Sequence, residues 1–313
     1  MSAKSAYAKL KIGVVGYGEV GKILARALRE KGVAWVGAWD LQLRDAAQGP
    51  GMKRHAKQAR VEACGSLEQL LERAEIVISA VTAANAFDVA REAAQSIRAD
   101  TYFLDLNSAS PATKAKAAKL VDAAGAHYVE AGVMTSVPPY GIRVPMLLGG
   151  REARALAEKL VPLGFDMTVI AEKIGVASAI KMCRSVFIKG LEAIVIESYS
   201  TARRYGVERE VLASLAETFP ETDWEKQGSY LFSRVARHGK RRAEEMREAA
   251  NTVREAGFEP WMSAATAEKQ DWFAALAKTL SDDPGKEPGW RDYADGMIAA
   301  QGEGKASGKR LKG

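Results

Sequence analysis

Two groups of residues carry the chemistry that this sequence could perform: a glycine-rich stretch near the N-terminus and a lysine in a long helical segment. Residues 16–21 read Gly-Tyr-Gly-Glu-Val-Gly, a G-x-G-x-x-G pattern. An apolar run precedes them, residues 22–30 favour a helix, and Asp40 ends the next apolar run. In this context the pattern predicts that a dinucleotide pyrophosphate lies against the helix N-terminus, where backbone N–H groups are free.

The predicted cofactor contacts follow from that loop and from the strand ends beside it: Gly16, Tyr17, Gly18, Glu19, Val20, Gly21, Asp40, Val81 and Thr82. Gly16 permits the tight turn, Gly18 lets the backbone approach the phosphates, and Gly21 lets the helix pack on the strand. Asp40 would accept hydrogen bonds from a ribose 2′-OH and repel a 2′-phosphate, which favours NAD. Arg44 follows closely and could instead hold a phosphate, so NADP stays possible.

A polar stripe recurs at steps of three or four residues within residues 175–205, which are predicted to form one long helix ending at Gly206. Its members are Ser178, Lys181, Ser185, Lys189 and Glu192. Such a stripe can be the solvated face of an amphipathic helix. It can also line a cleft in which a partly desolvated lysine acts as a general acid–base. The residues by themselves leave both interpretations open.

The elements that position these residues divide the chain into two halves. Strands are predicted at residues 11–15, 33–39, 75–81, 101–106, 127–131, 144–148 and 167–170, with helical runs between them. Ser66 with Gln69, and Ser110 with Pro111, mark two helix starts. This alternation predicts an α/β fold, a Rossmann-type doubly wound parallel sheet.

After about residue 172 the strand signals stop and an all-α region follows. Helices are predicted at residues 175–205, 208–218, 223–238, 241–256 and 262–280, with prolines between several of them. We therefore expect a dinucleotide-binding domain over residues 1–172 and a helical substrate and dimerisation domain over residues 173–300. Residues 301–313 carry four Lys/Arg against one Glu and are expected to be a disordered basic tail.

Composition argues against several other classes of protein. The 313 residues suffice for two domains, and 47% hydrophobic with 27% charged residues is ordinary for a globular chain. Cys64 and Cys183 are the two cysteines, too few for a disulfide framework, and no long apolar segment suggests a leader or a membrane span. These features favour a cytoplasmic protein.

Metal and nucleic-acid partners are not expected. The three histidines, His55, His127 and His238, are scattered and have no metal-ligand spacing. The net charge of +6 lies partly on the basic tail, and no nucleic-acid-binding motif accompanies it. The expected partner is a small-molecule substrate.

Four segments in combination resemble the β-hydroxyacid dehydrogenase superfamily, which includes 6-phosphogluconate and 3-hydroxyisobutyrate dehydrogenases. Residues 16–21 match the cofactor loop, 105–111 resemble the substrate loop D-x-S-T-x-x-P, 130–136 stand where D-A-P-V-S-G-G is expected, and 175–185 match the G…K-x-x-N-N helix. The resemblance covers about residues 10 to 295. It implies that Lys181 is the catalytic lysine, that Asn107, Ser108 and Ser185 hold the substrate, and that the protein is a homodimer.

The chain departs from the family pattern where the substrate is recognised. Asn107-Ser108 stand for the serine-threonine, Met134-Thr135-Ser136 for the serine-glycine-glycine, and Arg184-Ser185 for the asparagine pair. Thr135, Ser136 and Arg184 are therefore the candidate substrate-specific contacts. These departures suggest a divergent branch that acts on a different substrate.

We expect an NAD(P)-dependent oxidoreductase that transfers a hydride between nicotinamide and the hydroxyl-bearing carbon of a small hydroxy acid, with Lys181 as general acid–base. Two alternatives remain. An imine reductase-like enzyme belongs to a related class, although that class usually replaces the lysine. A non-catalytic binding protein could also use a dehydrogenase scaffold.

Overall fold

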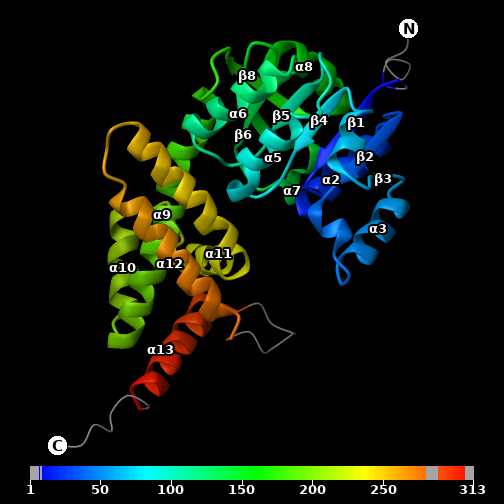
Figure 1. The fold of residues 1–313 in the computed structure, drawn as a ribbon. Helices are drawn as coiled ribbons and strands as arrows, with labels where there is room; N and C mark the ends of the chain where they lie inside the picture. The colour runs from blue at the N-terminus through cyan, green and yellow to red at the C-terminus, as the bar shows by residue number, and fades with distance from the viewer. Residues whose placement is uncertain (1–6, 8, 280–287, 307–313) are drawn as a thin grey trace, which may run out of the picture. The chain divides into compact units, whose positions relative to one another are not determined.

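The computed structural model describes residue 7, residues 9–279 and residues 288–306, and it contains two compact units (Figure 1). The first unit is Met1–Cys183 with Asn251–Gly257, and the second is Arg184–Ala250 with Phe258–Gly313. The division falls inside one long helix, beyond residue 172 where the strand signals end. The chain therefore crosses between the units three times, at residues 183/184, 250/251 and 257/258.

An eight-stranded sheet with the order β3-β2-β1-β4-β5-β6-β7-β8 forms the centre of the first unit. The strands are β1 (Lys11–Val15), β2 (Trp35–Trp39), β3 (Glu62–Ala63), β4 (Ile76–Ser79), β5 (Tyr102–Asp105), β6 (His127–Val133), β7 (Pro145–Gly149) and β8 (Asp166–Ala171). Neighbouring strands are parallel except for the antiparallel pair β6 and β7. The predicted Rossmann-type sheet is confirmed; the two-residue strand β3 was not predicted.

Helices cover both faces of this sheet, as a doubly wound fold requires. Side chains of α2 (Glu19–Glu30), α3 (Gly49–Gln58) and α8 (Ala153–Leu160) belong to one apolar cluster, and those of α4 (Leu67–Leu71), α5 (Ala86–Ala93) and α6 (Pro111–Ala123) belong to another. Strand β1 supplies both clusters, because Ile12 and Val14 join the first and Val15 joins the second. The short helix α7 (Val137–Tyr140) follows β6.

The second unit is helical and has an aromatic core. It contains most of α9 (Val176–Tyr205) and of α11 (Trp224–Glu255), and all of α10 (Glu208–Thr218), α12 (Trp261–Ala277) and α13 (Trp290–Ala306). Phe232 of α11 lies at the centre of this core, with its ring centroid 5.6 Å from that of Phe273 on α12. Trp290 of α13 completes the cluster and donates from Nε1 to Glu225, at 2.9 Å. The predicted α-helical C-terminal region is confirmed.

Two expectations for this unit were wrong. The helices predicted at residues 223–238 and 241–256 form the single helix α11, which runs through Gly239. A Cβ at Gly239 would lie 2.5 Å from the Ala274 side chain and 2.8 Å from the Gln270 carbonyl, so this glycine permits close packing of α12 and does not end a helix. Helix α13, which was not predicted, continues to Ala306. Residues 301–306 of the expected disordered tail are therefore helical, and residues 307–313 lie outside the described residues.

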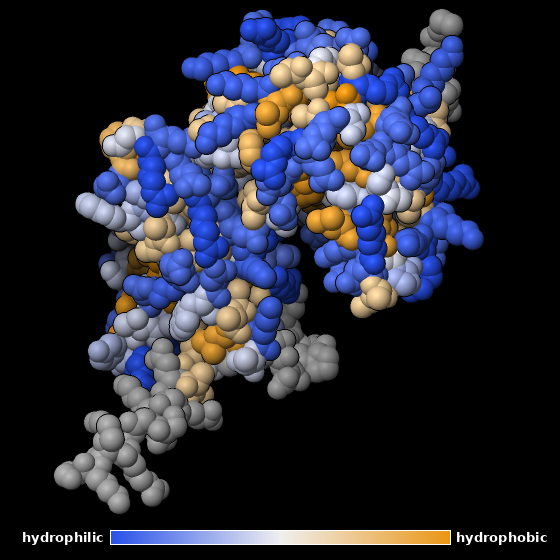
Figure 2. Space-filling view, viewed as in Figure 1, coloured by the Kyte–Doolittle hydropathy of each residue, from blue (hydrophilic) through white to orange (hydrophobic). Residues whose placement is uncertain are grey.

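The face of the molecule shown in space-filling form is mainly hydrophilic, with apolar surface gathered in patches (Figure 2). Within the described ranges, no helix is long and apolar enough to cross a membrane.

Phe232→Ala tests the aromatic core. Removing a fully buried phenyl ring that packs on four other aromatic side chains should lower the free energy of unfolding by about 3–5 kcal/mol. Urea denaturation followed by tryptophan fluorescence measures the change. The matched control is Tyr230→Ala on the same helix, where the side chain is exposed and the loss should stay below about 1 kcal/mol. Equal losses in the two variants would show that Phe232 is not central to this core.

Candidate functional site

The glycine loop joins the end of β1 to the start of α2 with the geometry that a phosphate-binding turn needs. Gly16 has φ of +90°, and a Cβ there would lie 2.5 Å from the Ala80 carbonyl oxygen. A Cβ at Gly21 would lie 1.9 Å from the Gly16 carbonyl oxygen, so this glycine lets α2 approach the turn. A Cβ at Gly18 would meet nothing within 4 Å, and no side chain caps α2. The N–H groups of the first turn of α2 therefore suit an anionic pyrophosphate.

Asp40 is fixed beside this loop at the end of β2. Its Oδ2 accepts a hydrogen bond from the Tyr17 N–H at 2.7 Å, and its Oδ1 accepts from the Gln42 N–H at 2.8 Å. Each oxygen keeps a further lone pair, so the carboxylate can also accept from ribose hydroxyls. Arg44 donates to the Gly65 carbonyl at 2.9 Å. These contacts favour Asp40 as the ribose ligand and give Arg44 a structural partner.

The side chain of Tyr17 turns into the protein. It is fully buried, its hydroxyl lies 3.0 Å from His55 Nδ1 on α3, and burial raises its pKa to about 12. Burial is also the main cause that lowers the pKa of His55, with smaller effects of Lys22 and Arg26. Tyr17 can therefore contact a cofactor through its backbone, while its ring holds α3 against the loop.

The loops after β1, β4, β5 and β6 meet at one edge of the sheet, because these strands are parallel neighbours. Asn107 links two of them. Its Oδ1 accepts from the Val81 N–H at 2.7 Å, and its Nδ2 donates to Ser79 Oγ at 2.9 Å. Thr82, which follows, is exposed. Both polar atoms of the Asn107 amide thus have protein partners, and this side chain fixes the shape of the edge.

A buried polar cluster lies directly before Asn107 and was not found from the sequence. The Asp105 carboxylate forms an ion pair with Lys114 Nζ at 2.9 Å and accepts from the Tyr128 hydroxyl at 2.6 Å and the Asn107 N–H at 2.8 Å. Burial and the adjacent Asp105 raise the pKa of Tyr128 well above its usual value. The cluster holds the start of the 105–111 loop rigidly. A signal was present: Asp105 ends an apolar strand.

Lys181 lies in the second turn of α9, and this part of the helix belongs to the first unit. A Cβ at Gly132 of β6 would lie 2.9 Å from the Ala177 carbonyl oxygen and 3.5 Å from Lys181 Cβ. The absence of a side chain at Gly132 therefore lets α9 rest on the sheet. Lys181 is half-buried. The structure thus places the predicted catalytic lysine in the same compact unit as the glycine loop.

The polar stripe of α9 is not a solvated face, because its other four members are buried. Ser178 donates to Glu130 at 2.8 Å. Lys189 Nζ lies 3.1 Å from Ser185 Oγ and 2.9 Å from Glu245 of α11. Glu192 is paired with Arg242 of α11 and accepts from Gln270 of α12 at 3.0 Å. Most of the stripe serves to pack the helices of the second unit.

The remaining candidate substrate contacts differ in exposure. Ser108 and Ser136 are half-buried, and Thr135 is exposed, all three in the first unit. Arg184 is exposed and Ser185 is buried, both in the second unit. Because α9 is continuous, Ser185 lies one turn after Lys181 on the same side of the helix.

The end of α11 belongs to the first unit and is hydrogen-bonded to the start of α6. Glu255 accepts from the Ser110 hydroxyl at 2.6 Å and from the Ala112 N–H at 3.0 Å. Ser110 is the N-cap that the sequence predicts, and it accepts from the Thr113 N–H at 3.3 Å. The long-range partner Glu255 had no signal in the sequence. It secures the far end of the 105–111 loop.

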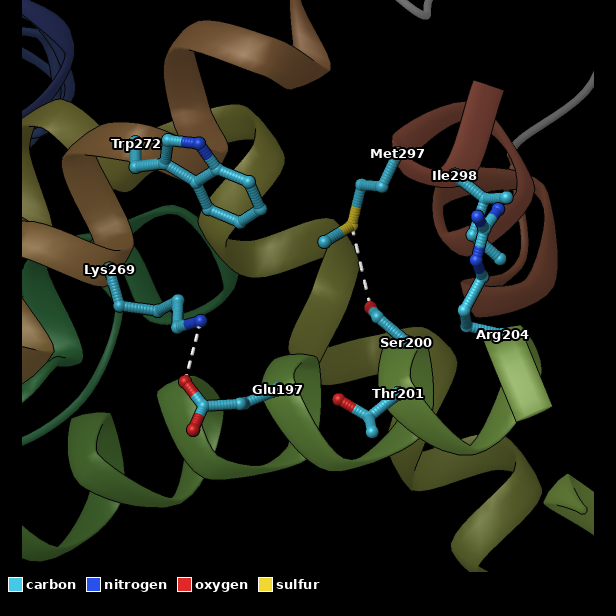
Figure 3. A pocket seen from close by; sticks show the side chains of 8 residues that line it. All are labelled: Glu197, Ser200, Thr201, Arg204, Lys269, Trp272, Met297 and Ile298. Carbon is cyan, nitrogen blue, oxygen red and sulfur yellow. Dashed lines mark hydrogen bonds and ion pairs between the residues drawn. The ribbon is translucent and has the colours of Figure 1, made fainter. Parts of the chain in front are cut away.

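A hollow of about 180 Å³ in the second unit lies among other residues (Figure 3). It is lined by Glu197, Ser200, Thr201, Arg204, Lys269, Trp272, Met297 and Ile298. The Lys269 ammonium lies 2.6 Å from the Glu197 carboxylate. None of the candidate site residues lines it. In the part of the chain that the structure describes, no group of His, Cys, Asp and Glu could hold a metal ion.

Two family models match the chain. Residues 11–158 match the NAD binding domain of 6-phosphogluconate dehydrogenase, and residues 202–273 match a domain of unknown function (DUF1932). The first match spans the glycine loop, Asp40 and the sheet edge described above. The cofactor is therefore NAD, with NADP possible.

Several relatives cover nearly the whole chain. An uncharacterized 28.5 kDa protein of Methanothermus fervidus is 30% identical over 260 residues, which are 82% of this chain and 96% of that protein. The solved structure of a conserved hypothetical protein from Sinorhizobium meliloti 1021 is 36% identical, covers 93% of this chain and 96% of its own, and has a TM-score of 0.70.

A third relative is a conserved protein of unknown function described as structurally similar to 3-hydroxyacid dehydrogenases. It is 31% identical, covers 86% of this chain and 98% of its own, and has a TM-score of 0.65. More distant solved structures share the fold alone. They include a Mycobacterium tuberculosis 3-hydroxyisobutyrate dehydrogenase at 15% identity and an Aspergillus terreus reductive aminase at 18%, with TM-scores of 0.68 and 0.55.

Asp40→Ala tests the cofactor site. It removes the acceptor for the ribose hydroxyls, so the Kd for NADH should rise about tenfold. It also removes the charge that repels a 2′-phosphate, so the ratio of the Kd for NADPH to the Kd for NADH should fall. Fluorescence titration with both reduced cofactors measures this. Asp45→Ala, in the following turn, is the control and should leave the preference unchanged. A wild-type preference for NADPH would contradict the assignment of Asp40 and point to Arg44.

Proposed function

Because the chain belongs to the β-hydroxyacid dehydrogenase superfamily, we propose that it transfers a hydride between NAD(P) and the hydroxyl-bearing carbon of a small hydroxy acid. The observation that carries this proposal is the placement of Lys181. This lysine lies against Gly132 of β6, in the unit that also contains the glycine loop and Asp40. A dinucleotide site and a proton-transferring group are thus held by one rigid sheet.

A bound nicotinamide would supply the hydride-transfer chemistry at the substrate carbon. In the oxidative direction Lys181 Nζ takes the hydroxyl proton as the C–H hydride leaves and a carbonyl forms. In the reductive direction the Lys181 ammonium returns that proton to the oxygen. Its positive charge also stabilises the negative charge that develops on this oxygen.

Substrate recognition is assigned to polar residues of the 105–111 and 130–136 segments and of α9. We propose that Ser108, Thr135, Ser136 and Ser185 hydrogen-bond to the substrate and that Arg184 binds its carboxylate. Arg184 suits this role because its planar guanidinium can donate two parallel hydrogen bonds to a carboxylate. Asn107 contributes by holding the loop, since its amide is bonded to Val81 and Ser79.

A second candidate is imine reduction, because a reductive aminase is among the distant proteins that share this fold. Lys181 argues against it, because this related class usually replaces the lysine. A non-catalytic binding protein is a third possibility. One panel of aliphatic, aromatic and phosphorylated hydroxy acids and of cyclic imines, followed by NADH and NADPH absorbance, separates the three. Turnover of imines alone would overturn our proposal, and so would the absence of any turnover despite NAD(H) binding.

We propose that the protein is a homodimer in which α9 lies at the interface. Ile180, Phe187 and Ile194 of this helix are exposed by 42%, 72% and 53% and recur every seven residues. This spacing makes an apolar stripe along one side of a helix, the pattern by which helices pair. Large apolar side chains at such exposure are costly in water unless another surface covers them.

Lys181→Met tests the catalytic assignment. The value of kcat should fall by about 10²–10⁴-fold, because the variant lacks the group that transfers the proton, whereas the Kd for NADH should stay within about threefold. Steady-state kinetics and fluorescence titration give the two values. Lys173→Met, an exposed lysine just before α9, is the control and should keep its kcat. A kcat near that of the wild type in Lys181→Met would refute the assignment.

Phe187→Glu tests the dimer. A carboxylate at the centre of the apolar stripe should raise the dimer dissociation constant by more than about tenfold, because each charge would have to be desolvated against its partner. Sedimentation velocity over a concentration series measures this. Tyr140→Glu, at an exposed tyrosine of α7, should leave the dimer intact. A wild-type monomer at micromolar concentration would contradict the proposal.

A further inference from the structure

We infer that Glu130 is the positioning residue for Lys181: its buried carboxylate fastens the first turn of α9 to β6 and so sets where the lysine stands. This inference rests on the proposed function in so far as Lys181 is the proton-transferring group. Glu130 itself touches neither the reacting atoms nor the cofactor loop in any contact that the structure gives.

Three hydrogen bonds join the Glu130 carboxylate to the start of α9. Its side chain is 0% exposed. Oε1 accepts from the Gly175 N–H at 2.7 Å and from the Ala177 N–H at 3.0 Å, and Oε2 accepts from the Ser178 hydroxyl at 2.8 Å. Hydrogen bonds to a charged acceptor are the strong ones, and a negative charge is favourable at a helix N-terminus. One carboxylate from the sheet therefore satisfies three donors of the helix.

Two glycines make room for this joint. Gly149 of β7 is paired with Glu130 in the sheet, and a Cβ at Gly149 would lie 2.6 Å from Glu130 Oε1. Gly132 lies on the same face of β6 as Glu130, because successive side chains in a strand alternate between faces. A Cβ at Gly132 would lie 2.9 Å from the Ala177 carbonyl and 3.5 Å from Lys181 Cβ. Helix α9 therefore packs directly on the backbone of β6 at Gly132, next to the Glu130 carboxylate, and Lys181 Cβ lies at this contact.

The position of the lysine therefore depends on the joint. Beyond Lys181, the α9 side chains of Lys189 and Glu192 are bound within the second unit, Lys189 to Glu245 and Glu192 to Arg242 and Gln270. The Glu130 contacts hold the other end of the helix on the first unit. Without them, Lys181 would follow the helix and would no longer be fixed relative to the sheet edge. A displacement of about 1 Å at a reacting group can lower a rate about 100-fold.

The experiment compares Glu130→Ala and Glu130→Gln with the wild-type protein. Glu130→Ala should lower kcat by about 100-fold and change the Kd for NADH by less than about threefold. Glu130→Gln should recover most of kcat. Its carbonyl can still accept from the two N–H groups, and its amide can donate to Ser178 Oγ, whose hydroxyl can turn to the Gly175 carbonyl 3.2 Å away. Ser66→Ala, which removes the N-cap of α4 in the same unit, should keep its kcat.

A second measurement does not depend on turnover. Competitive acetylation with acetic anhydride, read by mass spectrometry, gives the labelling rate of Lys181 relative to Lys173. This ratio should change by at least about threefold in Glu130→Ala and stay near that of the wild type in Glu130→Gln and Ser66→Ala. If Glu130→Ala does not fold, Ser178→Ala replaces it, with a smaller change of the same kind expected because one of the three hydrogen bonds is lost.

The outcomes separate this inference from the proposed function. Changed labelling of Lys181 in a protein that turns over no hydroxy acid supports the joint and overturns the function. Measurable turnover with unchanged kcat and labelling in Glu130→Ala overturns the inference. A parallel loss of kcat and NADH affinity in this variant also overturns it, because that result indicates a general role in the fold of the first unit.

Discussion

A buried carboxylate is stable only where hydrogen-bond donors replace its water, and at Glu130 these donors are the Gly175 and Ala177 N–H groups and the Ser178 hydroxyl, at the start of a 30-residue helix. These hydrogen bonds hold α9 on β6, and two neighbouring glycines provide the space that the contact needs. Gly149 leaves space for the carboxylate and Gly132 lets the helix touch the strand. Lys181 follows on the same helix and lies against Gly132 of β6, which would give it the fixed geometry that the proposed proton transfer requires.

Buried polar side chains with several hydrogen-bond partners also fix the strand ends at the sheet edge beside the cofactor loop. Asp105 with Lys114 and Tyr128 fixes the end of β5, and Asn107 ties that strand end to β4. Glu255 secures the N-terminus of α6 beyond the loop. Hydrogen-bonded side chains thus make a rigid frame on which the less constrained residues Ser108 and Thr135 are presented. We interpret the departures from the family pattern at these positions as changes of substrate on a frame that stays the same.

Local sequence signals predicted the fold well and the site in part. The strands, the glycine loop and Asp40 follow from hydrophobic periodicity and from φ requirements, which are properties of neighbouring residues. What the sequence missed depends on residues far apart: Glu130 beneath α9, Glu255 at α6, and the burial of Ser185 and Lys189. The helices predicted at residues 223–238 and 241–256 are one helix that runs through Gly239, because glycine weakens an isolated helix but here allows close contact with α12. The assignments of Arg184 and Lys181 to chemistry remain predictions.

The three crossings of the chain between its compact units have a consequence for how such a protein can be taken apart. No single cut in the backbone releases the helical unit, because residues 251–257 return to the sheet and donate Glu255 to the 105–111 loop. A gene fusion that exchanged everything after α9 would therefore also exchange Glu255, which binds Ser110 and Ala112 at the start of α6. An exchange of the helical unit that preserves the contacts of α6 therefore has to keep residues 251–257 with the sheet.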